Sequence, residues 1–191
     1  MLYKQFNMFP YTYNYDKLQY DDEGLWSITI PTDADKISKI IKKELNNNSI
    51  LIDATCGLGG NIISFSKYFK KVIGIEINID RYKMLLNNTK LYNLNNIYII
   101  NNNCINFICN IKIKYDGIFL DPPWGGPNYK YIKNIRLKLS NYSLIDIIRL
   151  IKNINNIKIF IKLPFNYDLT EFYNLNYKIY KINNFYLLVI Y

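Results

Sequence analysis

Histidine is absent from this sequence of 191 residues. Its side chain serves as the general base of Ser-His and Cys-His enzymes and as a usual ligand of zinc, because its unperturbed pKa lies near neutrality. The absence excludes those nucleophilic machineries, and we expect no bound metal. Any enzyme with this sequence must do its chemistry without a base of neutral pKa.

Cysteines are few, and long apolar runs are missing. Cys56, Cys104 and Cys109 are too few and too scattered for a disulfide framework, which fits a reducing compartment. No uncharged apolar stretch reaches membrane-spanning length, and the first residues lack the core of a signal peptide. We expect a soluble intracellular protein with no membrane partner, in the nucleus or cytoplasm, or in the host cytoplasm for a viral protein.

Basic residues outnumber acidic ones, 24 against 15, which gives a formal net charge of +9. This balance favours a polyanionic partner such as RNA or a nucleotide. The length suits one well-buried α/β domain and is too short for two ordinary ones. We therefore predict a monomer with an N-terminal arm or lid over residues 1–30 and a single domain over residues 31–191.

Residues 1–24 of the arm are aromatic and polar without a clear period, so we predict irregular structure for them, with disorder as the alternative. A helix is predicted after Pro31, ending at Asn46-Asn47-Asn48. Strands and helices then alternate, which is typical of parallel βαβ crossovers and a sheet covered on both faces. The predicted strands are 50–53, 72–76, 97–100, 115–121 and 157–163, and the helices lie near 61–69, 81–91 and 143–153.

The C-terminal end differs, because residues 177–182 and 185–190 have the pattern of two strands joined by a tight turn at Asn183-Asn184. The predicted fold is thus a doubly wound α/β sheet, mostly parallel, with a C-terminal antiparallel hairpin. It resembles the Rossmann-like fold of class I methyltransferases.

One candidate site lies between the first strand and its helix, in the loop Asp53-Ala54-Thr55-Cys56-Gly57-Leu58-Gly59-Gly60-Asn61. Glycines there permit tight turns and close approach of a ligand. Their spacing is not that of the dinucleotide fingerprint, and no Lys-Ser/Thr pair follows to form a phosphate loop. Glu76 ends the next strand, where its carboxylate can accept both ribose hydroxyls of an adenosine.

This spacing is similar to the S-adenosylmethionine site of class I methyltransferases. The resemblance implies S-adenosylmethionine as the cofactor and S-adenosylhomocysteine as its product. In that family an acidic residue after the third strand binds the adenine amino group; Asn103 stands at that place here, and its amide oxygen can accept. Ile77 and Asn102 are expected to flank the adenine ring.

A second motif, Asp121-Pro122-Pro123-Trp124-Gly125-Gly126-Pro127, ends the apolar run 115–120. The prolines donate no N–H, so their carbonyls are free to accept from an amine, while carboxylate and indole complete a slot for a flat heterocycle. The motif is similar to that of amino methyltransferases in which the first side chain and the next carbonyl hold an exocyclic nitrogen. Asp121, Pro122 and Trp124 are the predicted catalytic residues, acting through orientation and proximity.

The string from Pro122 to Pro127, with the loop at 53–61 and Trp26-Ser27-Ile28-Thr29, resembles the trimethylguanosine synthase family over residues 9–190. The resemblance implies methyl transfer to the exocyclic N2 of 7-methylguanosine in an RNA cap, giving di- or trimethylguanosine. A 7-methylated purine is a cation, and the face of Trp124 would attract it.

The same resemblance implies roles for further residues. Tyr11 or Phe9 from the arm would close the other face of the purine, and Pro123 would contact it. Ser27 and Thr29 would line the methionine end of the cofactor. The expected cofactor set is Ser27, Thr29, Asp53, Thr55, Gly57, Gly59, Asn61, Glu76, Ile77, Asn103 and Asp121.

Two departures from the family concern charge. Members often carry Ser where this chain has Asp121, and they carry Arg where Phe165 here follows Pro164. Cap phosphates must then be bound by other cations, and the candidates are Lys4, Lys130, Lys133 and Lys162.

The predicted activity is S-adenosylmethionine-dependent methylation of guanosine N2 in an RNA cap, with capped RNA or a cap analogue as the partner. One alternative is an enzyme acting on guanine N2 or adenine N6 in ribosomal RNA or DNA, for which Asp-Pro-Pro-aromatic also serves. Another is a cap-binding module that has lost catalysis.

Overall fold

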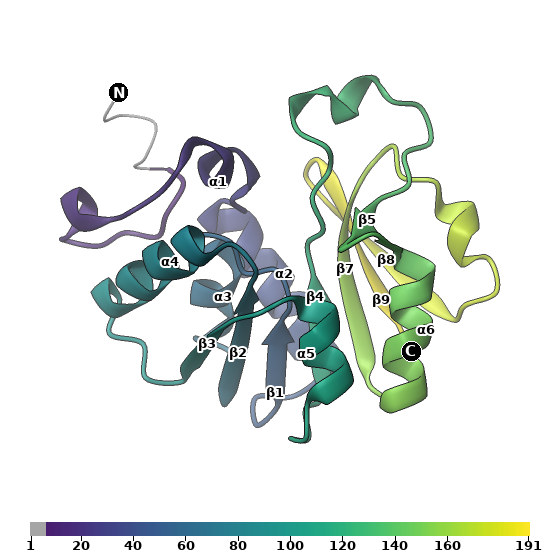
Figure 1. Ribbon diagram of the computed structural model, residues 1–191, viewed down its shortest axis with the longest axis horizontal. Coiled ribbons are helices and arrows are strands. Elements are labelled where there is room, and N and C mark those ends of the chain that lie inside the picture. Colours follow the sequence, from purple (N-terminus) through teal and green to yellow (C-terminus); the bar gives the residue numbers. More distant parts are fainter. Residues whose placement is uncertain (1–6) are drawn as a thin grey trace.

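The computed structural model describes residues 7–191, so Lys4 lies outside the described residues. This part of the chain holds a seven-stranded sheet in the order β3-β2-β1-β4-β7-β9-β8 (Figure 1). The first five strands of that order are parallel, and β9 runs antiparallel to both of its neighbours. The strand bounds are β1 (Ile50–Asp53), β2 (Lys71–Glu76), β3 (Ile97–Asn101), β4 (Gly117–Leu120), β7 (Lys158–Pro164), β8 (Tyr177–Ile182) and β9 (Phe185–Ile190).

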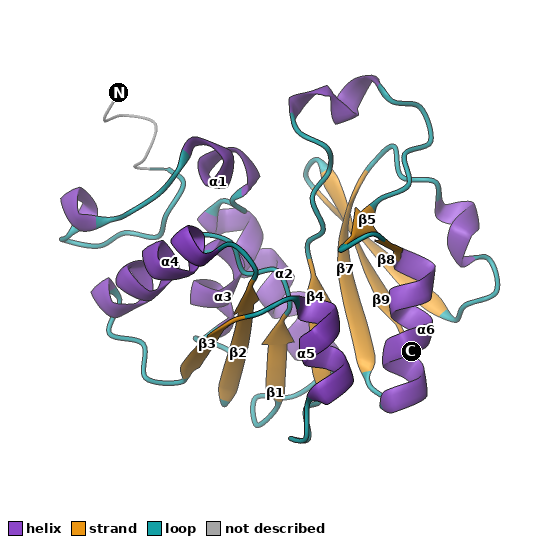
Figure 2. Ribbon diagram, in the orientation of Figure 1, coloured by secondary structure: helices purple, strands orange, loops and turns teal. Residues whose placement is uncertain are grey.

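Helices cover both faces of the sheet (Figure 2). The helices form two groups, one on each face of the sheet. The first group packs with Phe160 in a core cluster that includes Ile37, and the second packs with Ile161 in a cluster that includes Ile148. Successive side chains of β7 thus pack into the cores on opposite faces of the sheet, as the alternation of side chains along a strand requires. The first group is α2 (Pro31–Glu44), α3 (Gly60–Phe65) and α4 (Ile79–Leu91); the second is α5 (Cys104–Asn110) and α6 (Leu144–Ile154).

Local sequence accounts for these elements, as α6 illustrates. Its apolar residues Leu144, Ile147, Ile148 and Ile151 recur at helical spacing and are fully buried. The hydroxyl of Ser143 caps the helix by accepting from the amide of Asp146 at 3.3 Å. The predicted mostly parallel sheet with its C-terminal hairpin is confirmed. Helix α5 and the two-residue strands β5 (Lys138–Leu139) and β6 (Tyr142–Ser143) were not predicted from the sequence.

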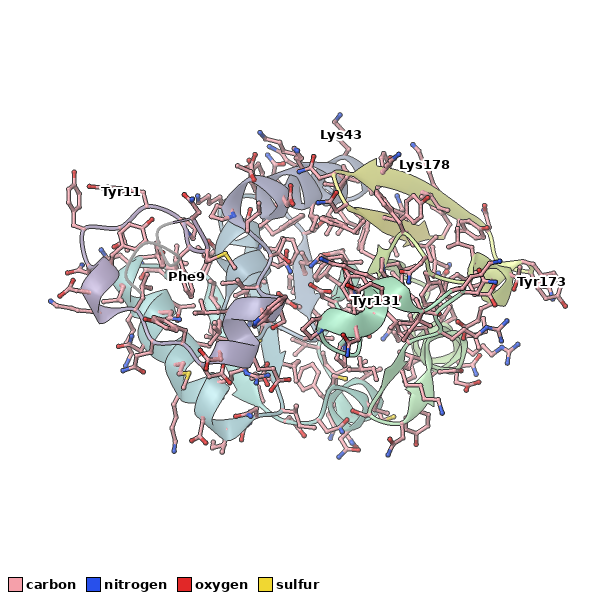
Figure 3. All side chains as sticks on the ribbon, turned by 90° about the horizontal axis from the view of Figure 1, so that it is seen from above. Phe9, Tyr11, Lys43, Tyr131, Tyr173 and Lys178 are labelled. Carbon is pink, nitrogen blue, oxygen red and sulfur yellow. The ribbon has the colours of Figure 1, made fainter. Side chains whose placement is uncertain are left out.

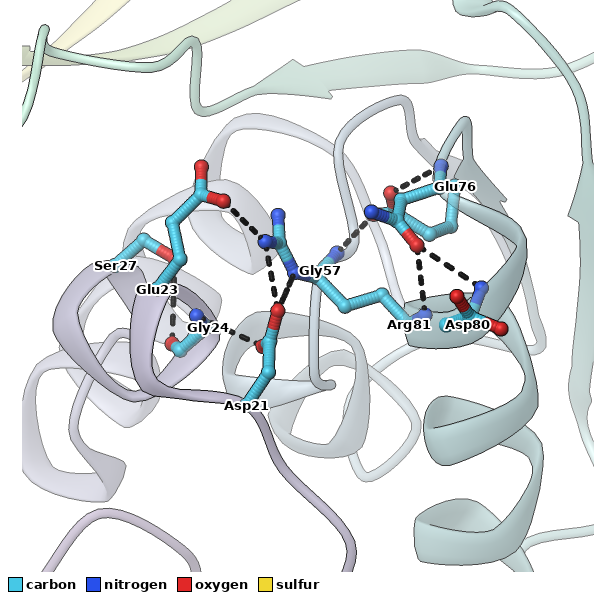
Figure 4. A network of polar contacts seen from close by, with 9 residues as sticks. Asp21, Glu23, Gly24, Ser27, Gly57, Glu76, Asp80 and Arg81 are labelled. Carbon is cyan, nitrogen blue, oxygen red and sulfur yellow. Dashed lines mark hydrogen bonds and ion pairs between the residues drawn. The ribbon is translucent and has the colours of Figure 1, made fainter.

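The arm is more ordered than predicted. It contains the short helices η2 (Tyr15–Lys17) and α1 (Asp22–Ser27), so the prediction of irregular structure was wrong for these residues. Arg81 of α4 holds α1 in place with ion pairs to Asp21 at 2.8 Å and Glu23 at 2.6 Å (Figure 4). The guanidinium of Arg81 also keeps the pKa of the Asp21 carboxyl below its ordinary value. This contact fixes the chain just before Thr29.

Candidate active site

The cofactor loop connects β1 to α3 and takes a backbone path that glycines allow. Gly57 and Gly59 have φ angles of +51° and +109°, in the left-handed region that residues with a side chain rarely adopt. Glu76, at the end of β2, supports the loop by accepting from the amide of Gly57 at 2.9 Å and from that of Asn78 at 2.8 Å (Figure 4). Each carboxylate oxygen has a second lone pair, so Glu76 can still accept a ribose hydroxyl.

Two buried acceptors beside this loop lack a donor. Asp53 is fully buried, and its Oδ1 accepts from the amide of Thr55 at 3.3 Å, but its Oδ2 has no partner among the described residues. The Oδ1 atom of Asn61 is in the same state within residues 7–191. Burial, together with the nearby carboxylates of Asp121 and Glu76, raises the pKa of the Asp53 carboxyl to about 8.

Unpaired buried acceptors are costly, and they mark a place where a ligand can supply the donor. The α-ammonium group of S-adenosylmethionine carries three N–H donors and a positive charge. Both properties match Asp53 and Asn61, so these residues fit that cofactor.

A cavity of about 420 Å³ opens in front of the loop and is of the size that small-molecule sites occupy. It brings together the arm, the cofactor loop and the Asp-Pro-Pro-Trp motif. Among the predicted site residues its lining includes Ser27, Thr29, Thr55, Gly57, Asn61, Asp121, Pro122, Pro123, Trp124, Lys130 and Lys162. The predicted cofactor residues outside its lining are Asp53, Gly59, Glu76, Ile77 and Asn103. Glu76 and Ile77 lie at the end of β2, with Ile77 exposed, and Asp53 is buried at the end of β1.

Trp124 is half-buried and borders this cavity. Its ring meets the ring of Tyr129 edge to face, with centroids 5.0 Å apart. The ammonium of Lys162 lies 5.0 Å from the centroid of the Trp124 ring. Its indole N–H is buried and has no acceptor among the described residues. The indole is therefore held in place by neighbours and keeps both a cavity-facing surface and an unused donor.

Asp121 is tied to three elements. Its backbone amide donates to the hydroxyl of Thr55 at 2.7 Å, and its Oδ2 accepts from Lys162 at 2.8 Å and from Thr29 at 3.4 Å. The other carboxylate oxygen, Oδ1, accepts no hydrogen bond from residues 7–191. Asp121 lines the cavity, so this oxygen is available to a ligand there.

The two arm rings expected over the purine lie elsewhere, which corrects that expectation. Phe9 is 1% exposed and packs with Leu18 and Leu58 in a cluster of the arm's own. Tyr11 is 71% exposed and lies at the outer edge of the molecule (Figure 3). Neither ring lines the cavity. The arm contributes Trp26 instead, which is 71% exposed and does line it. The sequence signal for Trp26 was its place directly before Ser27 in the segment Trp26-Ser27-Ile28-Thr29.

Other predicted residues have structural partners. The side-chain oxygen of Asn103 caps α5 by accepting from the amides of Ile105 at 2.8 Å and Asn106 at 3.4 Å, so the oxygen expected to meet the adenine amine is engaged. Asn102 is exposed after β3. Lys133 is exposed and does not line the cavity, whereas Lys130 does.

Comparison with known proteins identifies the family. A family model described as RNA cap guanine-N2 methyltransferase matches residues 48–187. This chain belongs to that family. Protein L320 of Acanthamoeba polyphaga mimivirus is 34% identical, over 88% of this chain and 75% of its own. The trimethylguanosine synthase of Saccharomyces cerevisiae is 31% identical, over 56% of this chain, which spans 36% of that synthase. The resemblance stated from the sequence is confirmed.

Solved structures agree on the fold. A precorrin-6y C5,15-methyltransferase from Geobacter metallireducens superposes with a TM-score of 0.65 at 14% identity, covering 92% of this chain and 94% of its own. A Streptococcus mutans chain solved in complex with SAH gives a TM-score of 0.53 at 16% identity, covering 85% of this chain and 98% of its own. The protein thus has the fold of S-adenosylmethionine-dependent methyltransferases. Within residues 7–191, no helix is long and apolar enough to cross a membrane, and no cluster of side chains suited to a metal ion is present.

Proposed function

We propose that this protein transfers a methyl group from S-adenosylmethionine to the exocyclic N2 of 7-methylguanosine in an RNA cap. One observation carries the proposal: an indole face and an unpaired carboxylate oxygen, from Trp124 and Asp121, border the same cavity next to the cofactor loop. A flat base can lie against the indole while its amine reaches the carboxylate. Family membership supplies the reaction class.

The chain's own residues would act mainly by orientation. Bound S-adenosylmethionine supplies an electrophilic methyl group on its sulfonium. Asp121 Oδ1 and the carbonyl of Pro122 would accept the two N–H groups of the substrate amine, which turns the nitrogen lone pair toward the methyl. After transfer the nitrogen carries one proton in excess, which leaves to water or transiently to the Asp121 carboxylate. A base of neutral pKa is then not required.

Trp124 would select the 7-methylated purine through its charge. Attraction between a cation and a desolvated indole is worth about 2 kcal/mol. The ammonium of Lys162 already lies near this ring, and two cations at one ring repel each other. The ion pair between Lys162 and Asp121 offsets that charge, so the ring can still receive a cation.

Phosphates of the cap and the RNA would be bound by the segment after the motif. Residues 122–145 contain Lys130, Lys133, Arg136 and Lys138 and no acidic residue. Arg136 is paired with Asp168, and Lys130 lines the cavity. A lysine that lines the cavity, in a segment rich in cations and without acidic residues, matches the negative triphosphate bridge of a cap.

A substrate panel tests this proposal. Initial rates are measured with 7-methylated cap dinucleotide, the unmethylated dinucleotide, uncapped RNA and DNA. We expect methylation of the 7-methylated cap and little of its unmethylated counterpart. Equal rates on the two dinucleotides would show that Trp124 does not sense the cation. Transfer to uncapped RNA or DNA alone would favour the guanine-N2 or adenine-N6 alternative, and calorimetry showing no binding of S-adenosylhomocysteine would favour a non-catalytic cap-binding module.

A further inference from the structure

Lys162 is a charged residue within the buried part of strand β7. Its neighbours in β7, Ile161 and Leu163, are fully buried, and Lys162 itself is 7% exposed. Burying an ammonium is unfavourable unless the charge is paired and hydrogen-bonded. Here Nζ donates to Asp121 Oδ2 at 2.8 Å and to the hydroxyl of Thr29 at 2.9 Å. The fold therefore places a compensated cation inside the candidate site.

Strand register explains why Lys162 meets the motif. Strands β4 and β7 are parallel, and Leu120 is the partner of Ile161. The next residues along the chain, Asp121 and Lys162, therefore lie beside each other, Asp121 directly after the end of β4 and Lys162 still within β7. A lysine one position earlier or later on β7 would point to the opposite face.

Thr29 completes the arrangement. Its hydroxyl oxygen accepts from Lys162 and, at 3.0 Å, from the side-chain amide of Asn61, so its own hydrogen is directed to Asp121 Oδ2 at 3.4 Å. A hydroxyl has two lone pairs and one donor, and all three are used. The carboxylate is thus held through Oδ2 by two donors, and Oδ1 keeps its lone pairs for the cavity.

The ammonium has little room for another anion. Besides its two hydrogen bonds, it faces the rings of Trp124 and Phe185 at 5.0 and 5.1 Å from their centroids. A cap phosphate could bind it only by displacing Asp121. These contacts argue against the phosphate-binding role that the sequence left open for Lys162.

We propose that Lys162 is a positioning residue for methyl transfer, which fixes the Asp121 carboxylate so that Oδ1 meets the substrate amine. This inference rests on the proposed function, since it concerns the carboxylate that would hold the amine. It assigns the chain a buried Lys–Asp pair as part of its amine slot.

A double-mutant cycle tests the pair, using Lys162→Met, Asp121→Asn and the double variant, with Lys162→Arg as the conservative change. Lys158→Met is the matched control, because Lys158 is a lysine of the same strand that is ion-paired to Glu44 at 3.1 Å, away from the cavity. Rates are measured as kcat and KM between pH 6 and 9, on whichever substrate of the panel above the wild-type protein methylates. Melting temperatures of all variants are measured without substrate.

Lys162→Met is expected to lower kcat by about 100-fold while KM changes by less than about threefold. In the Asp121→Asn background the same change should cost less than about threefold, since the partner is already gone. Lys162→Arg should keep most of the activity, and Lys158→Met all of it.

Other outcomes would overturn the inference. A raised KM with unchanged kcat, made worse by salt, would show that Lys162 binds substrate phosphate. Equal losses in both backgrounds, or additive melting temperatures in the cycle, would show that Lys162 does not act through Asp121. If the wild-type protein methylates only a substrate other than the 7-methylated cap, and the cycle on that substrate shows coupling, the positioning role of Lys162 is supported and the proposed substrate is refuted.

Discussion

Binding of S-adenosylhomocysteine is expected to strengthen as the pH rises from 6 to 8, because the ligand's ammonium group needs Asp53 in its charged form. Burial raises the pKa of the Asp53 carboxyl to about 8 in the ligand-free protein, and its Oδ2 has no donor among residues 7–191. At neutral pH the carboxyl is therefore mostly protonated. An arriving ammonium must displace that proton.

The size of the effect follows from linkage. With a pKa near 8, about 0.9 of the Asp53 carboxyls hold a proton at pH 7, so binding should release about 0.9 protons. Between pH 6 and pH 8 the association constant should rise about 50-fold, which corresponds to about 2.3 kcal/mol. The ligand is S-adenosylhomocysteine because it binds the same loop and does not react.

Isothermal titration calorimetry in buffers of different ionisation enthalpy measures the released protons directly. Asp53→Asn is the control: it keeps the shape of the side chain and removes its titration, so pH dependence that remains in this variant belongs to the ligand. Wild-type binding that releases no proton at pH 7, or a pH dependence equal to that of Asp53→Asn, would refute the assignment of Asp53 to the ammonium group.

Three further predictions concern the ligand-free fold. The folded-state pKa of Asp53 lies above its unfolded value, so its contribution to the free energy of unfolding is present below about pH 4 and is lost as the pH rises through about 8. In chemical denaturation at several pH values, Asp53→Asn should not show this loss. Arg81→Ala should destabilise the arm and lower the melting temperature by an amount equivalent to about 1 kcal/mol, whereas Arg81→Lys should lower it less. If the rate of limited proteolysis of the arm were unchanged in both variants, the ion-pair role would be contradicted. Gly60→Ala places a methyl group 2.5 Å from the carbonyl oxygen of Thr29, so it should lower the free energy of unfolding by about 2 kcal/mol and weaken ligand binding. A variant with unchanged stability and binding would show that Thr29 does not pack against the cofactor loop.

Periodicity was sufficient to predict the sheet and most of its helices. Buried strands such as β4 and amphipathic helices such as α6 carry their pattern in consecutive residues, so the alternation could be predicted without knowledge of contacts. Helix α1 has only six residues, and it depends on ion pairs to Arg81 about 60 positions away in the chain. The N-cap Asp21 is a local signal for α1, but six residues are too few to show a helical period, so the periodicity did not predict this helix.

The site divides in the same way. Its motifs stand in short continuous strings, and the structure brings these strings to one cavity. The direction of each ring does not follow from the string: Phe9 and Tyr11 are both aromatic residues of the arm, yet one is buried among arm residues and the other points to solvent. The role of Lys162 required the register of two strands far apart in the chain. A lysine between the apolar residues Ile161 and Leu163 was its only trace in the sequence.

The central claim is tested most directly by locating the transferred methyl group. The protein is incubated with S-adenosylmethionine and 7-methylated cap dinucleotide, the product is digested to nucleosides, and tandem mass spectrometry identifies the base and atom that gained the label. We expect one or two added methyl groups on N2 of the 7-methylguanine base, with the rate of transfer strongly reduced in Asp121→Asn and Trp124→Ala. A methyl group on any other atom, or undiminished transfer in both variants, would contradict it.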